Sequence, residues 1–207
     1  MTKTKFIISA IAAMALLSLL MTACGGCGKK GGKPGDFTYK LNDEGNGIVI
    51  TDYAGAGGKV IIPAVIDNLP VVEIGENAFR GSGGEIENPR AGDGITSVVI
   101  PIGVIKIDRG AFADCVSLIS VTMPDTVEEI REVAFRGCTS LVSVNLPAKL
   151  KLVGINAFFS DRELRNLSIP DDMTAIKWQG WNHFSGCGKL PDDTRKRLRE
   201  LGYLAGF

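Results

Sequence analysis

One short pattern recurs through most of the chain at a fixed interval of 23 residues. Proline marks four consecutive units, at Pro101, Pro124, Pro147 and Pro170. Phenylalanine follows at the same interval, at Phe112, Phe135 and Phe158. A constant period in this range is typical of proteins built from stacked repeats, in which each unit contacts only its neighbours. The chain is therefore expected to carry its activity on an extended surface rather than in one catalytic cleft.

Apolar residues occupy the same positions in each unit. Around Pro124 they are Leu118, Val121, Met123, Val127 and Ile130, and an Ala-Phe pair at 134–135 closes the unit. No unit can bury such a set alone, so the units must stack. The alternation over 121–123 predicts a short strand that the proline ends, because proline offers no N–H to a sheet. The second apolar pair, Val127 and Ile130, predicts another short strand or an irregular extended segment.

This unit resembles that of the BspA-like leucine-rich repeats, a bacterial family with the pattern Leu-x-x-Val-x-Ile-Pro-x-x-Val-x-x-Ile-x-x-x-Ala-Phe. The resemblance covers roughly residues 59–187, and the segment through Tyr203 is similar to the C-terminal ends of treponemal members. It implies a mostly β leucine-rich-repeat solenoid of about five rungs. It also implies a place on a bacterial surface and a role in adhesion or partner binding.

Two units depart from the pattern. The first is followed by a glycine-rich insertion at 80–94, expected to be a loop at a solenoid corner, the alternative being a binding loop. In the last, Phe184 comes late, and Trp178 and Trp181 are expected to cover the open end of the core; the alternative is an aromatic platform for a ligand. His183, the single histidine, has no acidic or thiol cluster at ligand spacing and is expected to be structural.

The amino terminus carries a second signal. Lys3 and Lys5 precede an apolar run over 6–20 that ends in Met21-Thr22-Ala23-Cys24. A basic start, an apolar core too short for a membrane span and small final residues predict a secretory signal over 1–23. The ending resembles a bacterial lipoprotein signal, which implies that Cys24 becomes an acylated first residue; a plain cleaved signal is the alternative. Acyl chains contribute about 0.8 kcal/mol per buried CH₂, so two or three would anchor the chain firmly.

The remaining segments frame the solenoid. Glycine and lysine dominate 24–36, which predicts a flexible tether. Strand-like segments at 37–41 and 48–53 flank a turn rich in Asn, Asp and Gly, so 37–58 is expected to be a β-hairpin cap. Residues 188–207 are expected to contain a capping helix that starts at Pro191 and stops at Gly202. A basic cluster lies on it, at Arg195, Lys196, Arg197 and Arg199, either as a solvated face or as a site for phosphate or acidic polysaccharide.

Candidate binding residues are the outward positions of the first strand column. Val99, Thr122, Asn145 and Ser168 each lie between two inward residues, and at about 4.8 Å per rung they are expected to form one ladder. They lack the tryptophan, tyrosine and arginine that dominate binding hot spots.

Cysteines recur at one repeat position. Cys115 and Cys138 are equivalent on adjacent rungs, Cys187 matches them in the last repeat, and Asp161 interrupts the column. They are expected to be small buried residues, and a Cys115–Cys138 disulfide is the alternative in an oxidising compartment.

Nothing in the sequence predicts an enzyme. It shows no nucleophile with a base, no opposed carboxylates, no metal cluster and no phosphate-binding glycine loop, so no catalytic residue, cofactor or metal is expected. Glu128 and Glu129 are expected to point to solvent. The chain has 23 basic and 23 acidic residues, and loss of the signal leaves it slightly negative, which argues against nucleic acid.

We expect a lipid-anchored outer-membrane protein, exposed at the cell surface, that binds a host or bacterial protein or a glycan. A periplasm-facing scaffold without an external ligand is the alternative, and the oligomeric state stays open.

Overall fold

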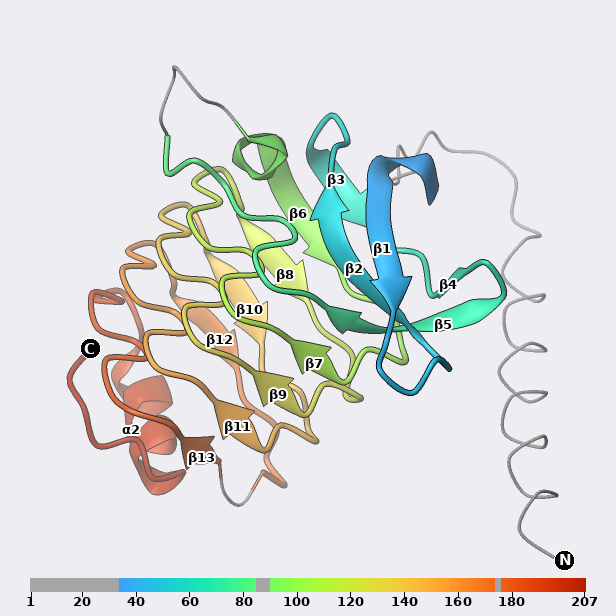
Figure 1. Ribbon diagram of the computed structural model, residues 1–207. Coiled ribbons are helices and arrows are strands. Elements are labelled where there is room, and N and C mark those ends of the chain that lie inside the picture. The colour runs from blue at the N-terminus through green and yellow to red at the C-terminus, as the bar shows by residue number, and fades with distance from the viewer. Residues whose placement is uncertain (1–33, 85–89, 174–175) are drawn as a thin grey trace, which may run out of the picture. The chain divides into compact units, whose positions relative to one another are not determined.

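The computed structural model describes residues 34–84, 90–173 and 176–207. The predicted signal peptide, Cys24, most of the tether and the centre of the 80–94 insertion lie outside these ranges. The described residues form a β-solenoid whose repeats each contribute one strand to each of two sheets (Figure 1). None of the helices in the described ranges is long and apolar enough to cross a membrane.

The strand before each repeat proline belongs to an all-parallel sheet with the order β12-β10-β8-β6-β3. Its strands are β3 (Gly58–Ile61), β6 (Ile95–Val99), β8 (Ser120–Thr122), β10 (Ser143–Asn145) and β12 (Asn166–Ser168). Val98, Val121 and Val144 are paired in register and buried. The predicted strand column is therefore confirmed.

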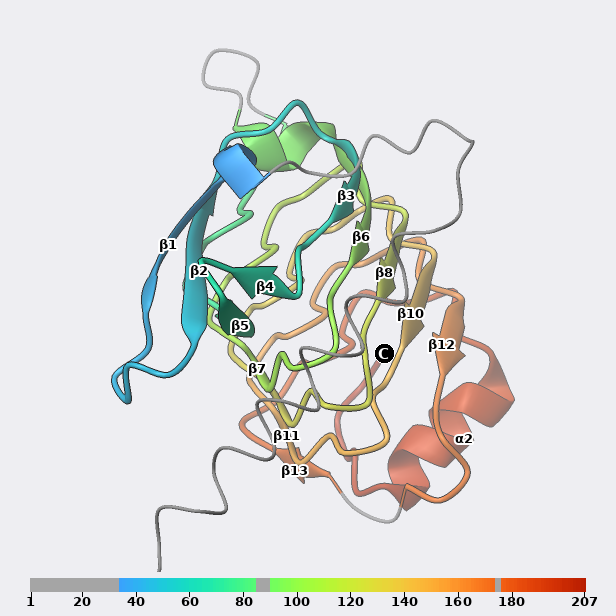
Figure 2. The same cartoon turned by 90° about the vertical axis from the view of Figure 1, so that its right-hand side faces the viewer.

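The second sheet lies on the opposite side of the solenoid (Figure 2), in the order β1-β2-β5-β7-β9-β11-β13. Its strands are β1 (Phe37–Leu41), β2 (Ile48–Tyr53), β5 (Leu69–Ile74), β7 (Lys106–Ile107), β9 (Glu129–Ile130), β11 (Leu152–Val153) and β13 (Lys177–Trp178). Short β4 (Val65–Ile66) pairs with β5. The second apolar pair of each repeat thus forms a two-residue strand. The hairpin is formed as predicted, with β2 extending the sheet parallel to β5.

A stack of phenylalanine rings runs through the solenoid. It contains one buried ring per rung, from Phe79, Phe112, Phe135, Phe158 and Phe184. Ring centroids lie 4.9 Å apart at the first step and 5.2 Å apart at every later step. Phe184 therefore stays in the stack although it comes late in the sequence. This stack explains why phenylalanine recurs in phase.

Aromatic residues cover both ends of this stack. Tyr53 stacks on Phe79 at the first end, and Tyr203 meets Phe184 edge-on at the last. Trp178 packs against Phe184 and donates its Nε1–H to the Leu201 carbonyl at 2.8 Å, as expected of a residue that covers the core.

The prediction that Trp181 also covers the core is wrong, because this side chain is 67% exposed. Trp181 stands three residues before Phe184, at the repeat position that Ile155 occupies before Phe158. Its carbonyl accepts the Asn156 N–H at 3.3 Å, so its backbone joins the rungs while the indole lies at the surface.

The C-terminal helix α2 (Asp192–Glu200) follows Pro191 and buries Leu198. Asp193 Oδ1 accepts the Thr194 N–H at 2.9 Å in the first turn of this helix. Gly202 ends the helix in the left-handed region, at φ 90°. The Tyr203 N–H then reaches back to the Leu198 carbonyl at 3.0 Å. Two short 3₁₀ helices, η2 (Pro34–Asp36) and η3 (Ala91–Gly94), complete the described elements.

Candidate functional site

The structure brings the four predicted binding residues into one column on the β12–β3 sheet. Val99 pairs in register with Thr122, and Asn145 with Ser168. Asn145 is already engaged, because its Oδ1 accepts the Met123 N–H at 2.9 Å and its Nδ2 donates to the Met123 carbonyl at 2.7 Å. This residue joins two rungs, and the column offers a partner little beyond small hydroxyl and aliphatic groups.

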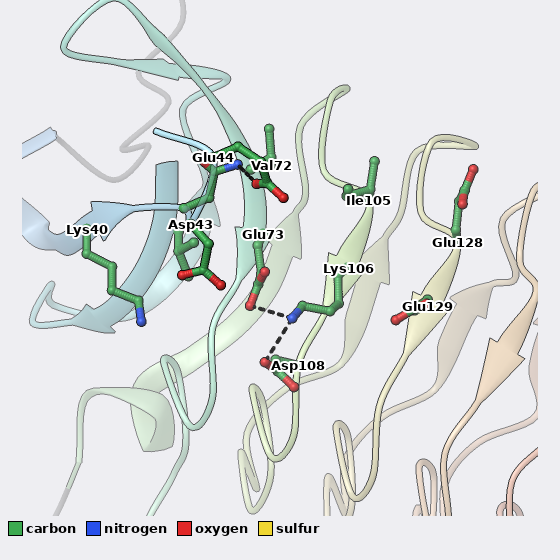
Figure 3. A pocket seen from close by; sticks show the side chains of 12 residues that line it. Lys40, Asp43, Glu44, Val72, Glu73, Ile105, Lys106, Asp108, Glu128 and Glu129 are labelled. Atoms are coloured by element: carbon green, nitrogen blue, oxygen red, sulfur yellow. Dashed lines mark hydrogen bonds and ion pairs between the residues drawn. The ribbon is translucent and has the colours of Figure 1, made fainter. Parts of the chain in front are cut away.

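A groove of about 480 Å³ lies on the other sheet, beside the hairpin (Figure 3). The turn between β1 and β2 forms one wall, and β5, β7 and β9 supply the floor and the far side. Six carboxylates and two ammonium groups line it. Its lining residues are Lys40, Asn42, Asp43, Glu44, Val49, Val72, Glu73, Ile105, Lys106, Asp108, Glu128 and Glu129.

The turn that forms the wall is held by its own asparagine. Asn42 Oδ1 accepts the N–H groups of Asn46 and Gly47 at 3.0 and 2.9 Å, and its Nδ2 donates to Glu44 at 2.8 Å. Gly47 lies so close to the sheet that an added Cβ would stand 2.6 Å from Val72 Cγ2. Glycine at this position lets the wall pack directly on β5.

Parallel pairing builds a charged row along the floor. Lys106 lies in register between Glu73 and Glu129. Its Nζ is 2.9 Å from Glu73 and 3.3 Å from Asp108, as the dashed lines of Figure 3 show. These three groups are more than half withdrawn from solvent, with side-chain exposures of 20% for Glu73, 28% for Lys106 and 29% for Asp108.

The environment of this row shifts the ionisation of its members. Burial raises the pKa of Glu73, against the opposing effect of Lys106. Burial acts to lower the pKa of Lys106, but its hydrogen bond to Glu73 and the charge of Asp108 outweigh burial and raise it. Burial also acts against ionisation of Asp108, whose pKa is nevertheless lowered by the Arg109 N–H and by Lys106. The row is a charged network with an excess of carboxylates.

The far side of the groove carries exposed ion pairs, Glu128 with Lys151 at 2.7 Å and Glu129 with Arg131 at 2.6 Å. Exposed pairs of this kind contribute about 0–1 kcal/mol each, so a competing cation can replace them at little cost. Ile105 lies between these pairs and the wall with 52% of its surface exposed. The groove therefore offers carboxylates around an apolar contact.

Sequence reasoning missed this groove, since Glu128 and Glu129 were expected to be ordinary solvent-facing residues. The sequence does contain one signal for the groove. On β5, β7 and β9, a charged residue directly precedes the buried isoleucine, and these charged residues are Glu73, Lys106 and Glu129. These three residues do not predict the wall of the groove, because the wall comes from the β1–β2 hairpin, which is distant in the sequence.

The structure also shows whether the cysteines of the repeat column are free or bridged. Cys115, Cys138 and Cys187 are free and buried, so the alternative of a Cys115–Cys138 disulfide is not realised. Each thiol instead donates to a carbonyl of the preceding rung, Cys115 to Phe79 at 2.9 Å and Cys138 to Phe112 at 3.2 Å. Burial raises the pKa of Cys115 to about 12 and that of Cys138 well above its ordinary value.

The basic cluster on α2 is largely engaged in holding the helix. Arg197 donates to the carbonyls of Asp171 and Met173 at 3.1 and 2.8 Å, and Arg195 donates to the Gly188 carbonyl at 2.8 Å. Arg199 lies over the Phe207 ring. These contacts occupy guanidinium N–H groups that an anionic ligand would need as hydrogen-bond donors.

His183 lies inside the C-terminal cap, 1% exposed, between the Trp178 and Tyr203 rings. Its Nε2 is 3.1 Å from the Gln179 carbonyl, and burial lowers its pKa. Within the described ranges, no group of three or more His, Cys, Asp or Glu side chains is placed to hold a metal ion.

Comparison with known proteins agrees with this architecture. The family model for the BspA type leucine rich repeat region matches residues 74–194 in six copies. No curated protein matches the chain.

Three solved structures are similar to the chain. The T. pallidum leucine rich repeat protein TpLRR has 28% identity and a TM-score of 0.50, over 86% of this chain and 99% of that one. A leucine-rich repeat protein from Bacteroides ovatus has 29% identity and a TM-score of 0.54, over 75% of this chain and 44% of that one. One from Bacteroides capillosus has 28% identity and a TM-score of 0.54, over 66% and 95%.

Proposed function

Because the chain belongs to the BspA-type leucine-rich repeat family, we propose that it is a non-enzymatic, lipid-anchored binding protein of the bacterial cell envelope. The solenoid presents a continuous sheet surface, which suits contact with an extended partner. The described residues include no assembly of nucleophile, base and oxyanion donors that would support catalysis.

The groove is the observation that carries this proposal. It combines a preformed wall, an exposed apolar side chain at Ile105 and six lining carboxylates. A protein segment with lysine or arginine flanking an apolar residue matches this lining in charge and in its apolar contact at Ile105. Electrostatic complementarity of this kind favours association and selects against acidic partners.

Anchoring rests on the N-terminal sequence. Cys24 ends a signal of the lipoprotein type and precedes a tether rich in glycine and lysine. Acylation there would hold the solenoid at a membrane while the tether lets its groove reach a partner. Substitution of Cys24→Ser is expected to abolish incorporation of an alkyne fatty acid and to release the chain from the membrane fraction.

Binding can be measured with two series of labelled peptides of equal length, one alternating lysine with leucine and one alternating glutamate with leucine. The full chain is expected to bind the basic series, more weakly as salt rises. The double substitution Asp43→Lys and Glu44→Lys changes two exposed residues of the wall. It is expected to weaken binding about tenfold or more, since two charge contacts are reversed.

A matched control is available at the other end of the solenoid. Asp171 and Asp172 are also an exposed acidic pair in a turn. Their double substitution to lysine makes the same change in net charge outside the groove and is expected to leave binding unchanged. An equal loss in both variants would show that net charge, and not the groove, attracts the peptide.

The location of the solenoid distinguishes the hypothesis of a surface protein from that of a periplasmic scaffold. Protease added to intact cells is expected to remove the solenoid while a known periplasmic protein survives. Protection of the solenoid until the envelope is broken would contradict surface exposure and leave the scaffold as the explanation.

A further inference from the structure

Asp161 is a carboxylic acid inside a column of thiols. It stands three residues after Phe158, as Cys115, Cys138 and Cys187 stand three residues after their own phenylalanines. Its exposed fraction is 0%. Each of those thiols donates to a carbonyl of the preceding rung, so the column is a row of polar contacts between rungs inside an otherwise apolar core.

The carboxyl group is only half satisfied by its surroundings. Its Oδ1 accepts the Cys138 N–H at 2.9 Å. Its Oδ2 is buried and has no hydrogen-bond partner among the described residues. The titratable groups that face it are the thiols of Cys138 and Cys187, and burial raises the pKa of both, which keeps them neutral. No cation compensates a charge at this position within the described ranges.

An isolated carboxylate in such an environment is costly, because burial of a charge without a partner is far less favourable than uptake of a proton. From this geometry we infer that Asp161 is a protonated carboxylic acid in the folded protein, and that it makes opening of the C-terminal end of the solenoid dependent on pH. Burial raises the pKa of Asp161 well above its ordinary value, in agreement with this state.

The position of Asp161 defines the part that opens. The last rung, residues 176–207, meets the preceding one through the Phe158–Phe184 ring contact, the Cys187 thiol on the Phe158 carbonyl at 3.0 Å and the Glu163–Lys189 ion pair. Separation at this joint exposes Asp161 to water, where it ionises above an ordinary pKa of 3.8. On its other side Asp161 meets the preceding rung through the hydrogen bond from the Cys138 N–H to its Oδ1, so only the joint between the Cys115 and Cys138 rungs contains thiols alone.

The direction of the effect follows from proton linkage. The folded state holds one proton that the opened state releases, so stability is full below the ordinary Asp pKa and is lost as pH rises toward the folded pKa. Across that window Asp161 by itself increases the population of the opened end by about tenfold per pH unit, the value for one proton, and buried His183 opposes this change below pH 6.5. The C-terminal rung is therefore the proton-linked segment of the fold.

Hydrogen exchange of the full chain in detergent tests this inference, with rates corrected for the intrinsic effect of pH. Peptides from 176–207 are expected to lose protection relative to peptides from 95–130 as pH rises above 6.5, where His183 of the same segment is neutral in the folded and the opened state and adds no change of its own. In Asp161→Asn the amide keeps an acceptor for the Cys138 N–H and carries no charge, so this relative loss is expected to disappear. Asp161→Cys, which continues the thiol column, should behave in the same way and serves if the asparagine variant fails to fold.

Infrared spectroscopy gives an independent readout. The folded chain at neutral pH is expected to show a protonated carboxylic acid band that both Asp161 variants lack. Absence of this band in the unmodified chain would overturn the inference. Parallel pH dependence of the terminal and central peptides, or the same pH dependence in the unmodified chain and the variants, would also overturn it.

Discussion

Val133 and Asn156 stand at the same position of consecutive repeats and share a left-handed backbone, with φ of 51° and 56°. Asn77, Gly110 and Asn182 fill this position in the other rungs with similar positive φ. Each stands two residues before a phenylalanine of the stack. Asparagine and glycine tolerate this region, whereas a β-branched side chain is strained there by about 1–2 kcal/mol. Val133 is therefore a site of backbone strain in a regular turn.

Replacement of Val133 by asparagine is expected to raise the free energy of unfolding by about 1 kcal/mol, because the strain is removed. Urea denaturation measures this difference. Val142→Asn is the control, since Val142 is a half-buried valine without a positive φ and should gain no stability. A Val133→Asn chain that unfolds at lower urea than the unmodified chain would contradict the assignment of strain.

Truncation of a ring at the centre of the phenylalanine stack is expected to cost more stability than truncation of Phe207, which lies outside the stack at the edge of the cap. Phe135 lies 5.2 Å from both Phe112 and Phe158, so Phe135→Ala should lower the free energy of unfolding by about 3–5 kcal/mol. Phe207 contacts Tyr203 and two arginines at the edge of the cap. Phe207→Ala should therefore lower the free energy of unfolding by only about 1 kcal/mol. Equal losses in denaturant titrations would show that the stack does not concentrate stability at its centre.

The buried thiols are expected to be inert in the folded chain. Because burial raises the pKa of Cys115 to about 12, almost none of it is the reactive thiolate at neutral pH. Iodoacetamide should therefore leave Cys115, Cys138 and Cys187 unmodified until the chain is denatured, as mass spectrometry of their peptides can show. Ser168→Cys places an exposed cysteine on the same solenoid and should react at once. Rapid native-state modification of Cys138 would be inconsistent with the buried column.

The sequence was sufficient to predict the elements of the solenoid. In a repeat protein, the same residue types recur wherever the same backbone position must be buried, so phase alone locates the strands and the phenylalanine stack. The hairpin could be read because its strands, 37–41 and 48–53, flank a turn of suitable composition. The helix could be read because Pro191 and Gly202 mark its ends.

The groove could not be predicted in this way. Asp43, Glu73 and Glu128 come from three segments that meet only after the hairpin adds to the sheet. A charged residue on a strand looks the same in the sequence whether it faces bulk water or a groove. The interruption at Asp161 was visible in the sequence. Its ionisation depends on its burial and on the lack of a neighbouring cation among the residues that the structure describes, and neither can be read from the sequence.

Two buried groups act on stability in opposite directions as pH changes. Burial lowers the pKa of His183 below its ordinary 6.5, so the unfolded chain takes up a proton first as the pH falls. The stability contributed by neutral His183 is therefore present above pH 6.5 and lost below it. Asp161 contributes the reverse, since its pKa is raised and its stability is lost as pH rises above 3.8.

Between pH 4 and pH 6.5 the two contributions oppose each other, and removal of one should reveal the other. Relative to the unmodified chain, Asp161→Asn is expected to gain stability as pH rises, by up to about 1.4 kcal/mol per pH unit. His183→Gln should lose stability relative to the unmodified chain as pH rises, because only the contribution of Asp161, which falls with pH, remains in this variant. Thermal unfolding across this range, taken as the difference from the unmodified chain, cancels the shared surface carboxylates. Difference profiles that stay flat for both variants would mean that neither group is held neutral by burial.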